Sequence, residues 1–386
     1  MSKLIGPVID EGAKQELVTF RRSLHTHPEV SGTESETRKR ILAEIGNLGG
    51  EITTYPDCNG VMLRVRNGEG KCMAVRADMD ALPIQECSGL SFASKNPGVM
   101  HACGHDVHMA LACASARYLA SHKEMWHGEA RFLFEPMEET VGGARLMAQD
   151  GCMEGVDAII GQHVNPSYPA GTYFCKPGYV SGSSDEIVVH ILGTGCHGAY
   201  PERGVDAIVI AAQVISSLQS LVSRNISPFD PVALTFGTIA GGSAKNIVCD
   251  RVTLTGTLRT LRSEVRSLMH DGIRRIAGET ASAFGGRAEV EITPGYGAVR
   301  NDDALYALVE ACAEKVFGKE HMVLREAPSL GVESICYFFD HAPGVYYDIG
   351  SGVGTALHTP TFCVDEDCLF SGLEMQLTCL LSYLGE

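Results

Sequence analysis

The segment HACGHDVHMA, residues 101–110, places three histidines, one cysteine and one aspartate within ten positions. Cys103 and His105 are two residues apart, as in a chelating loop. His101, His105 and His108 have the i, i+4 and i+3 spacings that put side chains on one face of a helix. Either geometry could bind a metal ion. The alternative is a helix start with capping residues and a partly buried histidine.

Three other segments carry side chains of the same chemistry. In EPMEET, Glu138 and Glu139 are neighbours on an expected loop and point different ways, so one can bind a metal ion while the other faces a substrate. A carboxylate near an activated water is the usual general base of metal-dependent hydrolysis. His163 in GQHV and His358 in ALHTPTF are single histidines beside apolar runs. Each feature alone is more typical of a solvated surface or of a structural histidine.

Together these segments offer one set of candidate metal ligands. The set comprises Cys103, His105, Glu139, His163 and His358. Five ligands are too many for one tetrahedral zinc ion. They suit two divalent ions that share a bridging ligand and hold one water between them as the nucleophile.

The elements that position these residues have a recognisable order. CMAVRADMDALP closes on Asp78 and Asp80, ARFLFEPMEET closes on the glutamate pair, and DAIIGQHV closes on His163. Helix-like stretches such as MALACASARYLASH lie between these apolar runs. The alternation predicts an α/β domain with a mainly parallel sheet. Ligands of such sheets collect beyond the carboxyl ends of the strands, where the acidic residues and histidines fall.

Helical patterns precede the first of these runs. Apolar residues recur at helical spacing around Leu17. The sequence TESE has a capping-box pattern, in which Thr33 would pair with Glu36, and a glycine pair follows about a dozen residues later. We therefore expect two helices before the first long strand.

A second domain is indicated from about residue 183. DEIVVHILGTG, PVALTFGTIAGG, DRVTLTGTLRT and RAEVEIT read as strands, and two helix-like stretches are interleaved with them. The resulting βαββαβ order is that of a ferredoxin-like domain. We expect a discontinuous catalytic domain, residues 1–182 and 296–386, and an inserted α+β domain, residues 183–295, that acts as a lid or in dimerisation.

Length, composition and charge limit the remaining possibilities. A chain of 386 residues favours two domains. A net charge of −16 repels phosphates and anionic lipid, so neither nucleic acid nor a membrane is an expected partner. The amino-terminal residues lack the features of a secretory signal. The 14 cysteines are scattered without a C-x-x-C pair, which is typical of reduced thiols and predicts a cytoplasmic protein.

The motifs resemble those of the dinuclear-metal amidohydrolases that include aminoacylases, hippurate hydrolases, auxin-conjugate hydrolases and N-acetyldiaminopimelate deacetylases. The similarity covers RADMDALP, HACGHDVHMA, the glutamate pair, GCHGAYP, GGSAKNIV, GTLRT and LHTPTFCVDE, in this order. It runs from RRSLHTHPE at residues 21–29 to the carboxyl terminus. It implies hydrolysis of the amide bond of a small N-acyl amino acid by a homodimer or a tetramer.

The resemblance implies a role for each candidate in the larger domain. Cys103 would be a bridging thiolate, Glu138 the general base, and Asp78 a group that orients a ligand imidazole. The remaining ligands would be His105, Glu139, His163 and His358. Two divalent ions are implied, with manganese or zinc favoured and cobalt or nickel as alternatives, because thiolate prefers zinc-like ions whereas carboxylate and imidazole accept the others.

The inserted domain is expected to supply substrate contacts. His197 would stabilise the oxyanion, and in this family it often reaches into the site of a partner subunit. Asn246 and Arg259 would hold the oxygen atoms and the carboxylate of the substrate, a task that suits the planar fork of arginine. The alternative for Arg259 is a simple ion pair on a strand.

Three departures from the family pattern stand near these motifs. Glu135 precedes Pro136 where the family usually has Gln-Pro, and Glu202 follows Pro201 where it usually has Pro-His. The usual Ser-Glu-Asp-Phe stretch reads GVESI, which keeps Glu333 and loses the aspartate. None of these changes removes a proposed ligand, but they alter the wall of the pocket and predict a changed substrate preference.

Two other functions compete with metal-dependent hydrolysis. A metal-free hydrolase could use Cys103 as the nucleophile and His105 as the base, but it leaves Glu139, His163 and His358 without a purpose. A non-catalytic protein could bind a metal ion or an acylated ligand and respond by domain closure. Such a protein has no need of a general base, so the intact Glu138 argues against it.

Overall fold

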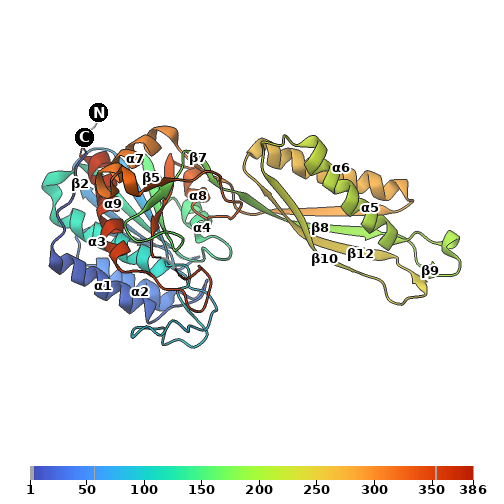
Figure 1. Ribbon diagram of the computed structural model, residues 1–386, viewed down its shortest axis with the longest axis horizontal. Coiled ribbons are helices and arrows are strands. Elements are labelled where there is room, and N and C mark those ends of the chain that lie inside the picture. The colour runs from blue at the N-terminus through green and yellow to red at the C-terminus, as the bar shows by residue number, and fades with distance from the viewer. Residues whose placement is uncertain (1–3, 56, 353, 386) are drawn as a thin grey trace. The chain divides into compact units, whose positions relative to one another are not determined.

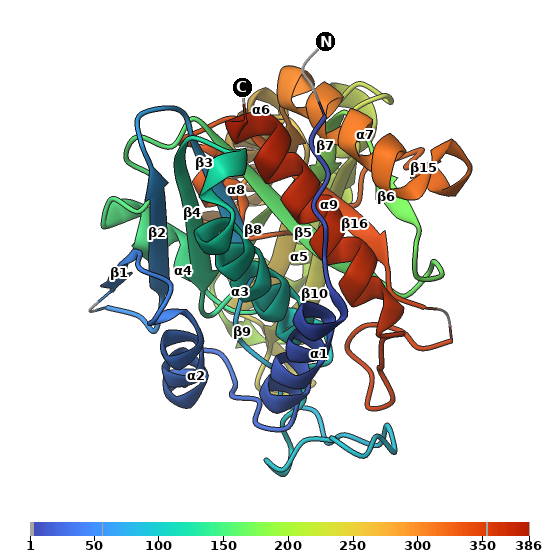
Figure 2. The same cartoon turned by 90° about the vertical axis from the view of Figure 1, so that its left-hand side faces the viewer.

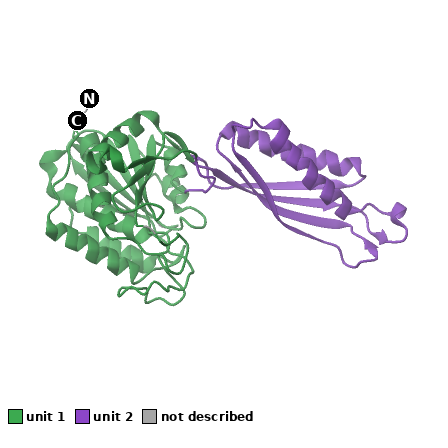
Figure 3. Ribbon diagram, in the orientation of Figure 1, with its two compact units in different colours: residues 1–180, 300–327, 334–386 green, residues 181–299, 328–333 purple. Residues whose placement is uncertain are grey.

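The structure, a computed structural model, describes residues 4–55, 57–352 and 354–385. The chain forms two compact units (Figure 3). Unit 1 comprises residues 1–180, 300–327 and 334–386, and unit 2 comprises residues 181–299 and 328–333. The short segment 328–333 belongs to unit 2, although the sequence assigned it to the flanking domain. Its backbone is bound there, since the Gly182 amide donates to the Gly331 carbonyl over 2.9 Å.

Unit 1 is built on a mixed sheet of eight strands among the described residues, in the order β1-β2-β4-β3-β5-β16-β6-β15 (Figures 1 and 2). The central pairs β4–β3, β3–β5 and β5–β16 are parallel, which confirms the predicted fold class. The strands are β1 (Glu51–Thr54), β2 (Val61–Asn67), β3 (Cys72–Asp78), β4 (Gly128–Glu135), β5 (Ala158–Asn165), β6 (Tyr173–Cys175), β15 (Met322–Leu324) and β16 (Gly344–Gly350). A further small sheet pairs β7 (Gly178–Ser181) with β14 (Val299–Asn301).

The helices of unit 1 bury the faces of this sheet. They are α1 (Glu11–His25), α2 (Ser35–Ile45), α3 (His105–Ser121), α4 (Gly143–Gln149), α7 (Asp303–Phe317), α8 (Cys336–Phe339) and α9 (Asp367–Leu384). Helices α3 and α9 lie side by side across the central strands, with α1 against α3 (Figure 2). The core between them is apolar and includes Phe132, Leu111 and Leu377. Burial of this surface is the main favourable contribution to folding.

The first turn of α3 lies directly against β5 because the residue before it is a glycine. Gly104 has a φ of 82°, and a Cβ atom there would lie 2.2 Å from Cγ2 of Val164. A side chain is excluded by both the left-handed backbone and this close approach. The tight packing places His105 next to the carboxyl end of β5.

The predicted helix after residue 33 is present, but its predicted cap is wrong. The hydroxyl of Thr33 donates to the carbonyl of Val30 instead of capping the helix. The carboxylate of Glu29 accepts from the backbone amides of Glu36 and Thr37 at the first turn of α2. A carboxylate from outside the helix, which a local motif does not reveal, therefore satisfies these free amides.

Unit 2 is an α+β domain with the predicted βαββαβ order. Its antiparallel sheet has the order β10-β12-β8-β13 among the described residues, with two helices on one face (Figure 1). The elements are β8 (Ser183–Leu192), β9 (Cys196–His197), α5 (Ala207–Ser220), β10 (Val232–Gly241), β11 (Ile247–Val248), β12 (Arg251–Thr260), α6 (Ser263–Ala283) and β13 (Arg287–Pro294). Alternate residues of β8, such as Ile187 and Val189, are buried against the helices. This arrangement confirms the ferredoxin-like topology.

Helix α5 begins the most apolar helical stretch of unit 2. The segment Ala207–Asn225 is long and apolar enough to cross a membrane by length and composition alone. In the structure, Ile210, Val214 and Leu218 of this segment are buried in the core over the sheet. Its apolarity is therefore that of a core helix with a second, exposed apolar side.

Candidate functional site

The five candidate ligands predicted from the sequence lie together beyond the carboxyl ends of the strands of unit 1. Sγ of Cys103 is 3.5 Å from Nε2 of His163 and 3.3 Å from Nε2 of His358. Nε2 of His358 is 3.2 Å from Oε1 of Glu139, and Nε2 of His105 is 4.0 Å from the same oxygen. Ligand atoms from segments as many as 255 residues apart in the sequence therefore lie close enough together to bind the same metal ion.

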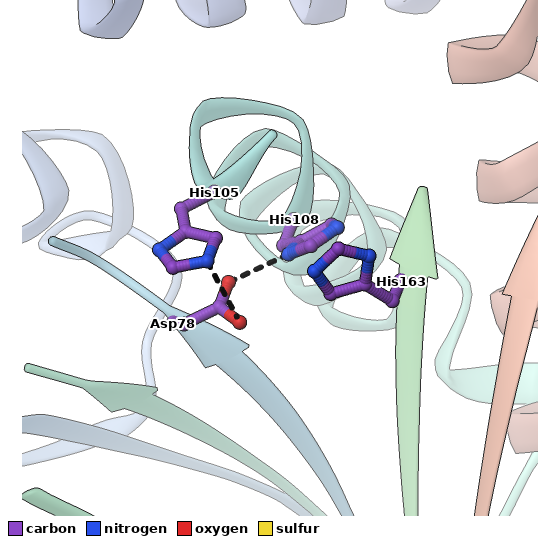
Figure 4. A group of neighbouring side chains, drawn as sticks. All are labelled: Asp78, His105, His108 and His163. Atoms are coloured by element: carbon purple, nitrogen blue, oxygen red, sulfur yellow. Dashed lines mark hydrogen bonds and ion pairs between the residues drawn. The ribbon is translucent and has the colours of Figure 1, made fainter. Parts of the chain in front are cut away.

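The ligand atoms form overlapping groups whose members all lie within 4.8 Å of one another. One group is Cys103, Glu139 and His358, and another is His105, Glu138 and Glu139. A third, fully buried group is Asp78, His105, His108 and His163 (Figure 4). A mixed set of thiolate, imidazole and carboxylate donors with this spacing has the chemistry to hold two divalent cations.

The backbone fixes which ring nitrogen of two histidines faces the centre. Nδ1 of His105 donates to the Asp80 carbonyl over 2.8 Å, and Nδ1 of His163 donates to the Val164 carbonyl over 2.7 Å. In the neutral form of either ring, Nε2 is therefore the unprotonated nitrogen, which is the form that binds a metal ion. Nε2 of His105 is buried and has no hydrogen-bond partner among the described residues. Such an orphaned nitrogen is costly unless a cation binds it.

His108 has a different function from the other histidines of Figure 4. Its Nδ1 lies 2.6 Å from Oδ1 of Asp78, and its Nε2 accepts from the Val164 amide over 3.1 Å. Burial lowers the pKa of His108 to about 4 against the opposing effect of Asp78. With both nitrogens engaged and the ring neutral, His108 orients Asp78 and is not free to bind a metal ion. The sequence had placed His108 only on a helix face that could bind a metal ion.

Two aspartates of the RADMD run support the cluster. Burial favours the neutral form of Asp78, but Arg76, His105 and His108 outweigh it and hold the pKa of Asp78 well below its usual value. The carboxylate of Asp80 accepts from the Glu139 amide over 3.0 Å and from the Ser31 hydroxyl over 2.6 Å. Sequence reasoning assigned no role to Asp80. Its position at the end of a buried strand was the available signal.

The Cys103 thiol is electrostatically unfavourable as a thiolate without a cation. Burial raises the pKa of Cys103, Glu139 and Glu138 raise it further, and His105 opposes them. A bound divalent cation reverses this balance, since a coordinating thiol is deprotonated outright. The environment of Cys103 therefore suits a metal ligand.

Backbone strain is concentrated at the same place. Met137 and His358, with φ values of 58° and 59°, are the non-glycine residues with a positive φ in the described part of the chain. Left-handed conformations of this kind cost about 1–3 kcal/mol and occur mostly at functional sites. Met137 directly precedes Glu138, and His358 is itself a candidate ligand. The left-handed backbone at Met137 and His358, which non-glycine residues rarely adopt, therefore sets the direction of the Glu138 and His358 side chains.

Glu138 lies at the edge of the cluster of candidate ligands, and it contacts Ser334 and Arg76 outside that cluster. Its Oε1 accepts from the Ser334 amide over 3.3 Å and lies 4.0 Å from a guanidinium nitrogen of Arg76. The residue is 8% exposed, so that it is close to water without being surrounded by it. A carboxylate with this access can exchange a proton with a water molecule or a substrate.

Asp106 anchors the first turn of α3 on the side away from the ligands. It lies 2.8 Å from Nε of Arg21 and 2.9 Å from Nδ1 of His25. Burial favours the neutral acid, but these two partners hold the pKa of Asp106 far below its usual range. Nearby, burial lowers the pKa of His101 to about 4, so its ring is neutral. The network ties α1 to the turn that carries Cys103 and His105.

In unit 2 the candidate residues do not converge. His197 is exposed on β9 and pairs with Ile247, and the Asn246 carbonyl accepts from the Gly198 amide over 2.7 Å. Nδ1 of His197 accepts from the Ala199 amide, which leaves Nε2 as the protonated nitrogen of a neutral ring.

Arg259 lies at the opposite end of the sheet from the other two. It pairs with Ser184 at the start of β8, whereas β9 and β11 adjoin the end of β8 and the start of β12. Arg259 lies eight residue steps along β12 from Arg251, which amounts to about 27 Å. The structure therefore brings His197 and Asn246 together but not Arg259 with them.

Comparisons with known proteins identify the family of this chain. The sequence pattern of peptidase family M20/M25/M40 matches residues 74–382. An N-acetyl-L-cysteine deacetylase of Bacillus subtilis is 37% identical, over 94% of this chain and 87% of the relative. An N-acyl-L-amino acid amidohydrolase of Geobacillus stearothermophilus is 38% identical, over 77% of this chain and 80% of the relative.

A solved structure extends the similarity to the fold. It is that of a Bacillus subtilis protein described as a dinuclear metal-binding peptidase of the M20 family. The two chains share 31% identity with a TM-score of 0.85, over 97% of this chain and 98% of the other. The matched family region begins in β3 before Asp78 and extends into α9, so it includes all five candidate ligands. The chain belongs to peptidase family M20/M25/M40.

Proposed function

We propose that this metal-dependent amidohydrolase splits the amide bond of N-acyl amino acids, with Glu138 as the general base. The observation that carries the proposal is the meeting of Cys103, His163, His358 and Glu139 within 3.5 Å of a neighbour, with Glu138 alongside. Two relatives named for N-acyl amino acid hydrolysis support the substrate class.

The chain offers ligands for two divalent ions, of which zinc or manganese suit the donors best and cobalt or nickel are alternatives. Cys103 would be one of the ligands that hold them. The other ligands would be His105, Glu139, His163 and His358, with Asp78 beside them. When bound, such ions lower the pKa of water and polarise a carbonyl oxygen.

Glu138 would carry the proton between water and the leaving amine. It accepts the proton of the attacking water and returns it to the nitrogen as the amide bond breaks. The Ser334 amide donates to one oxygen of this carboxylate over 3.3 Å and so helps to fix its position. The low exposure of Glu138 excludes bulk water from this exchange.

The residues of unit 2 would bind the substrate. His197 would donate from Nε2 to the oxyanion, and Asn246 would donate its amide hydrogens nearby. Arg259 would pair with the substrate carboxylate, since one nitrogen of its guanidinium is buried without a hydrogen-bond partner among the described residues.

The separation within unit 2 favours a homodimer. One small N-acyl amino acid cannot contact both ends of a sheet that are about 27 Å apart. If His197, Asn246 and Arg259 all act on one substrate, they must come from two copies of the chain. Each complete site would then combine Arg259 of one copy with His197 of the other.

The end of unit 2 that carries His197 has the surface that such a dimer requires. Five large apolar side chains there are between 47% and 58% exposed, namely Tyr200, Ile208, Val209, Ile239 and Ile247. Strand β10, which carries Ile239, lies at an edge of the sheet and can accept another strand. Exposed apolar groups beside a free edge are typical of an interface.

The metal-free cysteine hydrolase is disfavoured by the environment of Cys103. A nucleophilic cysteine needs a lowered pKa, whereas burial raises the pKa of this thiol. The structure describes fourteen free cysteines, most of them buried, which suits the reduced state expected in the cytoplasm.

The test is hydrolysis of a panel in which the acyl group and the amino acid vary independently. Protein loaded with zinc, manganese, cobalt or nickel is compared with chelator-treated protein, and bound metal is counted by elemental analysis. We expect turnover that requires about two ions per chain. Turnover that persists after chelation would support the cysteine hydrolase. Firm metal binding without hydrolysis of any panel member would support the non-catalytic function.

A further inference from the structure

Arg76 is a fully buried cation next to the proposed general base. It lies on β3 with a side chain that is 1% exposed. Its Nε donates to Oε2 of Glu135 over 2.7 Å, one terminal nitrogen donates to Asp78, and the other donates to the Ser334 hydroxyl over 3.0 Å. Each of the three guanidinium nitrogens therefore donates a hydrogen bond. The terminal nitrogen that donates to Ser334 also lies 4.0 Å from Oε1 of Glu138.

The stability of a buried guanidinium depends on how many negative charges surround it. Removing one partner of a buried ion pair is strongly destabilising because the remaining charge is left uncompensated. Adding an anion is also unfavourable, since it repels carboxylates that are already present. The surroundings of Arg76 therefore tolerate a change of charge at one position best when another position compensates.

Two of the three departures from the family pattern touch this one guanidinium. Glu135 stands where the pattern has a neutral glutamine. Ser334 follows Glu333, so it stands where the pattern has the aspartate of Ser-Glu-Asp-Phe. The two changes appear unrelated in the sequence, 199 positions apart, yet both side chains bond to Arg76. One position gains a negative charge and the other loses one.

We propose that Glu135 and Ser334 are a compensating pair, in which the counter-charge of Arg76 has moved from position 334 to position 135. Together with Arg76 they position the reacting groups. This inference rests on the proposed function, because the group positioned is the base Glu138. Glu135 and Ser334 are positioning residues, since neither lies among the candidate metal ligands.

The contacts of the pair show how it would hold Glu138. The other oxygen of Glu135 accepts from the Ala144 amide over 2.9 Å, so Glu135 is fixed at both oxygens. Ser334 accepts from Arg76 through its hydroxyl and donates to Glu138 through its amide. A rigid chain of bonds therefore runs from Glu135 through Arg76 and Ser334 to Glu138. With the negative charge at Glu135, at the end of this chain away from Glu138, the residue beside the base is the small, neutral Ser334.

The test is a cycle of four proteins: wild type, Glu135→Gln, Ser334→Asp and the double variant. Each single variant changes the charge around Arg76, and the double variant restores it. We expect each single variant to lose at least about tenfold in kcat with little change in KM, because a misplaced base impairs chemistry more than binding. We expect the double variant to recover to within about threefold of wild type.

A matched control uses the same strand. Glu129 of β4 is paired with Arg64, Arg66 and Arg131, away from the cluster. Ser334→Asp should not rescue Glu129→Gln in any measurement. Rescue there would show a general effect of the aspartate and would overturn the pairing.

The readouts separate this inference from the proposed function. Thermal unfolding of the four metal-loaded proteins needs no substrate, and it should show the double variant closer to wild type than the sum of the single shifts. If wild type hydrolyses no N-acyl amino acid, the proposed function fails while this thermal cycle still tests the pair. Additive losses in the thermal cycle overturn the compensation, and recovered Tm without recovered kcat overturns the positioning role.

Discussion

The two units hold their functional candidates in opposite ways. In unit 1, Cys103, His163 and His358 come from distant segments and meet within 3.5 Å. In unit 2, His197 lies on the two-stranded β9–β11 sheet, and Arg259 lies on β12 at the end of the four-stranded sheet away from it. The first arrangement is complete within one chain. If the candidates of unit 2 all act on one substrate, as proposed, another copy must supply the missing end.

The difference follows from the architecture of each sheet. Parallel strands all end at the same edge, so the residues that follow them converge. Antiparallel strands alternate in direction, so residues at successive turns fall at both ends. A mainly parallel sheet thus gathers a reactive centre, whereas an antiparallel sheet can present different groups to different sites.

The largest expected effect concerns unit 1 and its proposed base. Glu138→Gln keeps the shape of the side chain and the bond from the Ser334 amide, but removes the proton acceptor. We expect kcat to fall about 100- to 10,000-fold, the range for loss of general acid–base catalysis. Steady-state kinetics and elemental analysis should show this loss with both metal ions retained.

The exposed Glu124, which lies in the same unit, provides the control. Glu124→Gln should leave kcat and metal content at the wild-type level. Turnover of Glu138→Gln close to that of wild type would show that another group accepts the proton. Loss of metal along with activity would make Glu138 a ligand and not the base.

The next effect concerns unit 2 and tests whether its candidates act across copies. His197→Ala should lower kcat about 100- to 1,000-fold, as expected for removal of an oxyanion donor. When His197→Ala and Glu138→Gln proteins are unfolded and refolded together, mixed dimers form. Each mixed dimer would contain one complete site, so we expect about a quarter of wild-type activity to return.

The mixing experiment bears directly on the contrast between the units. Refolding each variant alone is the control and should recover no activity. If the mixture is as inactive as its components, His197 acts within its own chain, and the two ends of the sheet do not serve two sites. Sedimentation of the mixture establishes that dimers were present.

The sequence predicted the centre of unit 1 better than its surroundings. Strand ends drew attention to Glu139 and His163, and the segment 101–110 drew attention to Cys103 and His105. His358, a single histidine beside an apolar run, completed the set. Asp80 was visible only as the end of a buried strand and His108 only as part of a helical histidine face, because their roles depend on bonds that form in the folded chain. The Glu29 cap of α2 was missed because its carboxylate comes from outside the helix. Likewise, Glu135 and Ser334 looked like separate departures until Arg76 connected them.

The smallest expected effect is a pH dependence of stability that belongs to unit 1. Burial lowers the pKa of His25, but Asp106 and Glu86 outweigh it and the net shift is upward. Since the folded pKa exceeds the unfolded value of about 6.5, the stabilisation is fully present below that value. It is lost as pH rises through the folded pKa. Urea unfolding should therefore show a midpoint that falls as pH rises through the folded pKa of His25, and His25→Gln should remove this part of the slope.

The chain has a built-in probe for assigning this effect to one unit. Its single tryptophan, Trp126, is fully buried in unit 1. Fluorescence therefore follows unit 1, whereas far-ultraviolet circular dichroism follows both units. The exposed His127 is the control, and His127→Gln should keep the wild-type slope. Two results would count against this assignment: the urea midpoint of unit 2 shows the same dependence on pH, or His25→Gln leaves the dependence unchanged. Either result would mean that the network around Asp106 does not cause the pH dependence of unit 1.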